Sequence, residues 1–424
     1  MKSKRIQTIH WLDVLFTAVL LCLPLPFLMS RSLPFIYNDE FGYWGSAAAF
    51  AGYDWSEVIS RISYYSYGYS LFLAPLLLLF SNTADAYHAA LLLNGLWLAL
   101  TFWVLRAIVR RLFPDISPRL RAVFAFVSTL FSSSFTQVNF TWPEVLLYLL
   151  YCVLFLLVVL AAQSPRLWHY PAMALVCVYS YTVHQRTLGL AIAAGLFVLW
   201  QFFTKKITWR HLLAFAAVLA GCWLGAGALK AFVKQTSWPQ TTDAVEATNE
   251  MSGQLGKIQM IFTPSGMFDF ILSLSGKVFY MAAASMLVVF VTGTFCVQRL
   301  WQDFCTARRE KSLVHVDTVN AFLFLSTCAT VAISAIFMIV PGSTAHLYYG
   351  RYSDHIMGVL MLIGLCELYR RRLSWKMLAH SLALFLLLSI TAAYYRLRTG
   401  VGGGISINNA GIGPFVEYGT THFG

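Results

Sequence analysis

Acidic residues are few in this sequence, and several lie at the edges of long apolar stretches. Asp39 and Glu40 are adjacent, directly after the first apolar stretch and before a short helix-forming run. Two carboxylates at such a place could act as a general base or bind a metal ion. They could equally cap the following helix and favour its dipole. Glu144 follows Pro143 at the start of another apolar run, where an ionisable residue is a functional-site hypothesis.

Two basic segments could complement these carboxylates. His184 and Arg186 lie between two apolar runs, and Arg351 lies among tyrosines that include Tyr349. A guanidinium group matches phosphate oxygens in a bidentate way. The sequence therefore indicates these four residues as contacts of a donor phosphate or an anionic lipid headgroup. The alternative is that each arginine only anchors its helix at the membrane interface.

The composition predicts what must position these residues. Of 424 residues, 58% are apolar and 11% are charged, whereas a soluble domain carries about 25% charged residues. Several apolar runs reach the ~20 residues that a membrane-spanning helix needs, and strand-like alternation is absent. The net charge is +12, but the basic residues form short clusters between apolar runs, a pattern typical of membrane topology rather than of nucleic-acid binding. We therefore expect an all-α polytopic membrane protein without a nucleic-acid partner.

Hydropathy predicts about eleven transmembrane helices. They lie near residues 11–33, 87–109, 122–136, 143–162, 170–183, 187–203, 212–232, 278–298, 317–340, 355–369 and 377–395. The apolar stretch 66–80 has only 15 residues, and we interpret it as a juxtamembrane helix. If this stretch does not cross the membrane, the later basic clusters fall on the cytoplasmic side, as the positive-inside rule requires; if it does cross, they fall outside.

This topology gives one membrane domain over residues 1–395 and a short glycine-rich outer tail over 396–424. The amino terminus is expected in the cytoplasm, and the first outer loop, 34–86, carries Asp39 and Glu40 on the outer face of the plasma (inner) membrane. Glu144 is expected on the same face. The sequence contains no HExxH, GxxxxGK[ST], GxSxG or GxGxxG motif, which excludes the usual zinc-peptidase, nucleotide-hydrolase and serine-hydrolase signatures.

The arrangement resembles the GT-C superfamily of membrane glycosyltransferases, which includes protein O-mannosyltransferases and the aminoarabinose transferases of lipid A. The resemblance lies in Asp39-Glu40 after the first span, in the 66–80 helix and in Glu144 after a proline, and it covers roughly the first 165 residues. It implies Asp39 as the base or metal-binding acid, Glu40 as its partner and Glu144 as a second metal ligand. The family's basic proline-rich signature is missing at 66–69, which moves the expected phosphate contacts to Arg186 and Arg351.

The resemblance implies transfer of a sugar from a polyprenyl-phosphate-linked donor to a glycan, lipid or protein acceptor at the outer face. The outer carboxylates could hold Mg²⁺ or Mn²⁺, which prefer oxygen ligands. One alternative is an outer-face glycan polymerase or ligase, which the absence of arginine from loop 233–277 disfavours. The other is a non-enzymatic transporter of lipid or polysaccharide, for which charges at mid-membrane would be expected.

Overall fold

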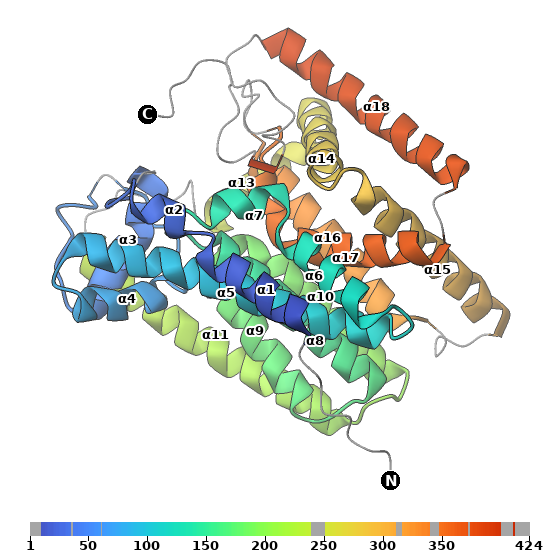
Figure 1. Ribbon diagram of the computed structural model, residues 1–424, viewed down its shortest axis with the longest axis horizontal. Helices are drawn as coiled ribbons and strands as arrows, with labels where there is room; N and C mark the ends of the chain where they lie inside the picture. The colour runs from blue at the N-terminus through green and yellow to red at the C-terminus, as the bar shows by residue number, and fades with distance from the viewer. Residues whose placement is uncertain are drawn as a thin grey trace.

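The computed structural model describes residues 10–34, 37–60, 62–238, 251–310, 316–339, 347–371, 374–399 and 410–411, and every regular element within them is a helix (Figure 1). The expected all-α class is thus confirmed. Seven stretches in these residues are long and apolar enough to cross a membrane, whereas the sequence predicted eleven spans. The seven are α1–α2 (Trp11–Cys22, Leu25–Leu28), α5 (Thr83–Leu112), α8 (Glu144–Gln163), η1–α10 (Gln185–Thr187, Leu188–Phe203), α11 (Trp209–Ser237), α14 (Pro264–Ala284) and α16 (Thr318–Phe337).

Further helices occupy the remaining expected spans but do not meet the same criteria of length and hydropathy. They are α6 (Pro118–Thr129), α7 (Ser132–Gln137), α9 (His169–Val183), α15 (Val288–Glu310), α17 (Asp354–Arg371) and α18 (Trp375–Thr399). The charged ends of α15 and α17 and the short lengths of α6, α7 and α9 explain the difference. The expected carboxy-terminal tail, 396–424, lies mostly outside the described residues.

Two expected spans are wrong as continuous helices. The span expected over 122–136 is interrupted between α6 and α7, and the span expected over 278–298 is interrupted between α14 and α15. At the second interruption Met286 and Leu287 have φ values of 50° and 69°, which an L-residue in a right-handed helix cannot adopt. Hydropathy averages over a window of residues, so it does not detect a break of this kind.

The stretch 66–80 forms α4 (Ser70–Leu79), a helix of 10 residues. Its length of about 15 Å is half of the ~30 Å that a spanning helix must cover. It packs on α3 (Tyr37–Ala51), where the Ser70 hydroxyl donates to the Tyr43 carbonyl at 2.7 Å. Gly68 fixes its start, since its N–H donates to the Thr182 carbonyl at 2.8 Å and a Cβ there would lie 2.5 Å from the Val183 nitrogen. The helix is thus shorter than a span requires, and its position beside the membrane stays a prediction.

Helix α8 is largely buried and packs against α5, α9 and α17. Helices α8 and α17 approach closely at Gly358, where a Cβ would lie 1.7 Å from the Tyr148 hydroxyl. This contact brings the first residue of α8, Glu144, close to the 3₁₀ turn η2 (Gly350–Tyr352) that precedes α17. The start of α3 carries Asp39, which pairs with Arg351 of η2.

Candidate active site

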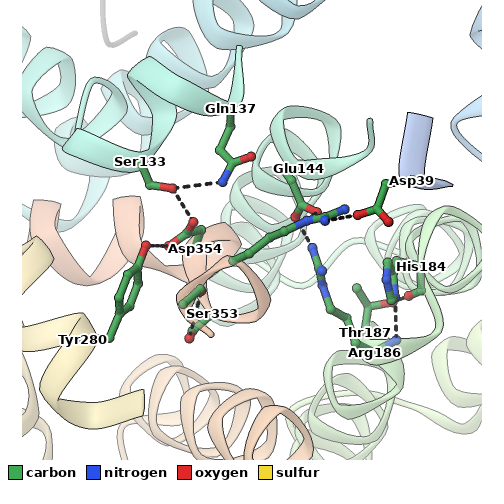
Figure 2. Close-up of polar contacts among 12 residues, drawn as sticks. Asp39, Ser133, Gln137, Glu144, His184, Arg186, Thr187, Tyr280, Ser353 and Asp354 are labelled. Atoms are coloured by element: carbon green, nitrogen blue, oxygen red, sulfur yellow. Dashed lines mark hydrogen bonds and ion pairs between the residues drawn. The ribbon is translucent and has the colours of Figure 1, made fainter. Parts of the chain in front are cut away.

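Four charged side chains form one continuous series of ion pairs where α3, α8, η1 and η2 meet. Arg351 donates through Nη1 to Asp39 and through Nε to one oxygen of Glu144. Arg186 donates through Nη2 to the other oxygen of Glu144. Figure 2 shows Asp39, Glu144 and Arg186 converging on one place. The structure therefore brings together four of the residues that the sequence indicated separately.

Burial differs along this series. The side chains of Arg186, Glu144 and Arg351 are 1%, 2% and 3% exposed, whereas Asp39 is 19% exposed. Two carboxylates and two guanidinium groups balance in charge, which is the condition under which buried charges are tolerated. Asp39 is consequently the end of the series that a second molecule can reach.

Aromatic rings hold the two guanidinium groups from the side. The Arg351 guanidinium lies 3.9 Å from the ring centre of Trp142, and that of Arg186 lies 4.6 Å from the ring centre of Tyr352. Cation–π contacts of this kind are strongest where water is excluded. His184 packs edge-on against the same Tyr352 ring, at 5.4 Å between ring centres. These ring contacts therefore fix the orientation of both guanidinium groups, and the ion pairs balance their charge.

Arg186 keeps hydrogen-bonding capacity that the described residues do not use. Its Nε and Nη1 atoms are buried and have no hydrogen-bond partner among them. The neighbouring His184 accepts from the Arg186 backbone N–H at 3.3 Å. Burial, followed by the charges of Arg186 and Arg351, lowers the pKa of His184 well below its usual value. A neutral histidine and two unused guanidinium N–H groups suit an anionic ligand, because buried donors without partners are rare.

Glu40 does not share the position of Asp39 and Glu144. It is fully buried, and its Oε1 accepts from the backbone N–H and the hydroxyl of Thr141, both at 2.7 Å, and from the Tyr87 hydroxyl at 3.2 Å. These bonds tie α3 to α5 and to the segment before α8. The geometry thus places only two of the three expected carboxylates together, and Glu40 is directed toward another set of partners.

Tyrosines complete the surroundings of Asp39. Burial, followed by the charge of Asp39 and a hydrogen bond to it, raises the pKa of Tyr65, which therefore donates to Asp39 in its neutral form. Tyr349 contacts Tyr352 edge-on at 5.0 Å between ring centres. The backbone carbonyl of Tyr349 accepts from Lys277 at 3.1 Å. Lys277 was expected in a long outer loop, but it is a wholly buried residue of α14.

Asp354 is a further acid near this site that the sequence reasoning did not single out. It is 5% exposed and lies at the first residue of α17. The signal was available, because Asp354 stands at the edge of an apolar run, as Glu144 does. The tyrosines and the arginine beside it suggested an interfacial belt instead.

The donor set at Asp39 and Glu144 does not fit a divalent cation as it is arranged. Arg351 pairs with both carboxylates, so the charge that a metal would neutralise already has a partner. In the part of the chain that the structure describes, no group of three His, Cys, Asp or Glu residues lies close enough to hold a metal ion. Magnesium and manganese favour about six oxygen ligands, several of which must come from the protein or substrate. We therefore assign Asp39 and Glu144 to ion pairing with Arg351.

Comparisons with known proteins give distant structural neighbours only. No family model and no curated protein matches the sequence. Among solved structures, the chain is similar to the apo oligosaccharyltransferase of Archaeoglobus fulgidus, with 12% identity and a TM-score of 0.47 over 95% of this chain and 56% of that one. The oligosaccharyltransferase AglB of the same organism, in complex with an inhibitory peptide and a dolichol-phosphate, gives 11% identity and a TM-score of 0.43 over 95% of this chain and 55% of that one.

A second neighbour is the arabinosyltransferase EmbB from Mycobacterium smegmatis, with 13% identity and a TM-score of 0.35 over 98% of this chain and 44% of that one. The chain thus spans about half the length of the structures that it matches. The first of these neighbours is an oligosaccharyltransferase and the second an arabinosyltransferase. At TM-scores below 0.5 the likeness is distant, so the functional argument depends on the geometry of the site.

Proposed function

We propose that the chain is an integral-membrane glycosyltransferase that moves a sugar from a polyprenyl-phosphate-linked donor to an acceptor hydroxyl on the outer face of the membrane. One observation carries the proposal. A partly exposed carboxylate, Asp39, and a buried arginine with two unused N–H groups, Arg186, belong to the same series of ion pairs. Sugar transfer from a phosphate needs a base for the acceptor and positive charge for the leaving phosphate.

The proposed reaction uses Asp39 as the base. The acceptor oxygen forms a bond to the anomeric carbon of the donor sugar while its proton passes to the Asp39 carboxylate. The bond between the anomeric carbon and the phosphate oxygen breaks, and its electron pair leaves with the phosphate. Arg351 holds the Asp39 carboxylate in place, because it donates directly to it.

Arg186 is proposed to receive the phosphate. Either its Nε or its Nη1 can donate to a phosphate oxygen while Nη2 remains bonded to Glu144. A hydrogen bond from a charged guanidinium group is shorter and stronger than one between neutral groups, so it positions a phosphate as well as neutralising it. In surroundings from which water is excluded, such fixed donors stabilise developing charge most strongly. Glu144 is then a positioning residue, since it holds both arginines and touches neither substrate.

The membrane assignment follows from the apolar helices, and the orientation is part of the proposal. The polyprenyl chain of the donor would lie in lipid beside helices such as α11, which carries many exposed apolar side chains. The basic clusters that precede and follow the spans support an outer position for Asp39 in the plasma membrane. The acceptor can be a glycan, a lipid or a protein.

The test is a transfer assay on the full chain reconstituted in liposomes with a labelled polyprenyl-phosphate sugar and isolated membranes as the source of acceptor. We expect Asp39→Asn to lower sugar transfer by about 10²- to 10⁴-fold, the usual contribution of a general base. Its melting temperature should stay close to that of the unchanged protein, because Arg351 keeps its ion pair with Glu144. The matched control is Asp54→Asn, an exposed aspartate in the loop after α3, which should transfer normally.

Full transfer by Asp39→Asn would refute the proposed base. A second readout follows the labelled lipid across the bilayer of protein-containing vesicles. Movement of the lipid without any transfer or release of polyprenyl phosphate would favour the transporter that the sequence left as an alternative.

A further inference from the structure

Asp354 is a buried carboxylate whose two oxygens both accept hydrogen bonds. Oδ1 accepts from the Tyr280 hydroxyl at 2.9 Å, and Oδ2 accepts from the Ser133 hydroxyl (Figure 2). Among the described residues no lysine, arginine or histidine forms an ion pair with it. A buried carboxylate without a paired cation lowers stability unless it is protonated. Its presence therefore calls for a role other than packing.

The two donors to Asp354 are themselves held in orientation. The Tyr280 hydroxyl accepts from the Gly411 N–H at 3.0 Å, so its own proton is directed to Asp354. The Ser133 hydroxyl likewise accepts from the Gln137 amide at 3.3 Å. Gly411 is required at its position, since a Cβ there would lie 2.3 Å from the Tyr280 hydroxyl oxygen. This second layer of contacts favours the ionised form of Asp354, whereas burial favours the neutral form.

A small cavity connects Asp354 to the ion pairs of the active site. It has a volume of about 10 Å³, close to the space of one water molecule, and both Asp354 and Glu144 line it. Gln137 also lines it, and the Oε1 atom of Gln137 is buried without a hydrogen-bond partner among the described residues. Asp354 and Glu144 are thus close enough for the charge of one to affect the other.

Charge counting then indicates the role. The series Asp39, Arg351, Glu144 and Arg186 sums to zero, and ionised Asp354 makes these five side chains together negative by one charge. A phosphodiester donor would add a further negative charge in surroundings where unbalanced charge is costly. We propose that Asp354 balances the charge of the donor-phosphate site by binding one proton when the phosphodiester binds beside Arg186. This inference depends on the proposed function and adds a proton linkage to it.

The proton affinity of Asp354 suits this role. Asp354 precedes the span expected over 355–369, and burial raises its pKa to about 7, while the hydrogen bonds from Ser133 and Tyr280 oppose that rise. The titratable and charged groups that face it are Tyr280 on α14, Glu144 and Tyr148 on α8 and Arg186 on η1, whereas the ring of the adjacent His355 packs against Tyr151. The buried Lys277 lies one turn before Tyr280 on α14 and donates to the Tyr349 carbonyl. Of these, Glu144 raises the pKa of Asp354 and Arg186 lowers it.

The experiment measures binding of a short-chain prenyl phosphodiester sugar to the full chain in nanodiscs by calorimetry between pH 6 and pH 8. A phosphodiester does not titrate in this range, so any protons taken up on binding are bound by groups of the protein. We expect uptake of up to one proton, measured in two buffers of different ionisation enthalpy. The dissociation constant should rise by up to about tenfold from pH 7 to pH 8, because ionised Asp354 must then be protonated first.

Asp354→Asn should bind with little pH dependence and take up no proton. Tyr280→Phe removes one donor to the ionised form, so the pH at which binding weakens should move upward. Asp115→Asn serves as the control, since Asp115 contacts Arg370 at the opposite end of α17 and should keep the pH dependence of the unchanged protein. Proton uptake retained in Asp354→Asn would overturn the inference.

The outcomes separate this inference from the proposed function. Absence of binding at every pH would refute the donor site itself. Binding that is independent of pH in the unchanged protein would refute only the role of Asp354. If Asp354→Asn does not fold, the direction of the shift in Tyr280→Phe decides, and no shift or a downward shift counts against the role.

Discussion

The two ends of helix α17 carry the same residue types in opposite surroundings. At its start, Arg351 pairs with Glu144 and Asp39, and the side chains of Arg351 and Glu144 are 3% and 2% exposed. At its end, Arg370 pairs with Asp115 and Arg371 with Glu367, and the two arginines are 31% and 55% exposed. The two clusters lie roughly 25 Å apart along the helix.

The difference lies in what happens when a partner is lost. An exposed arginine that loses its carboxylate is solvated by water, and exposed pairs contribute about 0–1 kcal/mol. A buried arginine that loses its carboxylate stays charged in apolar surroundings, which costs several kcal/mol. A fold keeps such a buried cluster only where other interactions or a function offset its cost. The start of α17 is therefore the end at which we propose the function, although both ends are rich in charge.

The largest effect is expected from Glu144→Gln. The substitution leaves Arg186 and Arg351 without their shared carboxylate, so the free energy of unfolding should fall by roughly 3–5 kcal/mol. Sugar transfer should be lost, because neither arginine keeps its orientation. Denaturant or thermal unfolding in detergent measures the first effect, and the liposome assay measures the second.

Glu367→Gln sharpens this comparison, because Glu367 is nearly as buried, at 4% exposed, but its arginine partners reach solvent. It should cost about 1 kcal/mol or less and leave transfer intact. Equal losses of stability in the two glutamine variants would show that burial of the carboxylate decides the cost, rather than burial of the cation.

The sequence indicated the acids and the arginines of this site but not how they pair. Asp39 and Glu144 could be found because ionisable residues at the edges of apolar runs are conspicuous. The pairing of Arg351 with these two acids could not be predicted. Arg351 lies 312 residues after Asp39, and only the packing of α8 on α17 brings them together. Glu40 was grouped with Asp39 because they are adjacent, yet neighbouring residues on a helix point in different directions.

The helical class and the short α4 helix followed from hydropathy and loop charge, which depend only on the order of apolar and basic residues along the chain. The interruption at Met286 and Leu287 did not, because positive φ values there leave no mark in a window of apolar residues. The proposed charge-balancing role of Asp354 was equally out of reach. It depends on Ser133, Tyr280 and Gly411, which come from distant parts of the chain.

A smaller effect is expected from Arg186→Lys, which keeps a positive charge near Glu144 and removes the guanidinium donors. The KM for the donor should rise by about 10- to 100-fold, the value of a lost hydrogen bond to a charged group, and kcat should fall less. Steady-state kinetics with varied donor concentration measures both. Arg370→Lys provides the matched control at the other end of α17 and should leave both constants unchanged. A donor KM in Arg186→Lys equal to that of the unchanged protein would show that Arg186 does not bind the phosphate.

The smallest effect is expected from Asp115→Asn. Its hydrogen bond from the Arg370 side chain lowers the pKa of Asp115. Because the pKa is lower in the folded protein, any stabilisation is present at neutral pH and is lost as the pH falls through that lowered value. Both partners are partly or largely exposed, so their attraction is screened by water and salt, and many such pairs contribute nothing measurable. Melting curves of Asp115→Asn and the unchanged protein at pH 7 should therefore coincide, and transfer should be equal. A clearly lower melting temperature would mean that this end of α17 also depends on its ion pairs, and the contrast between the two ends would fail.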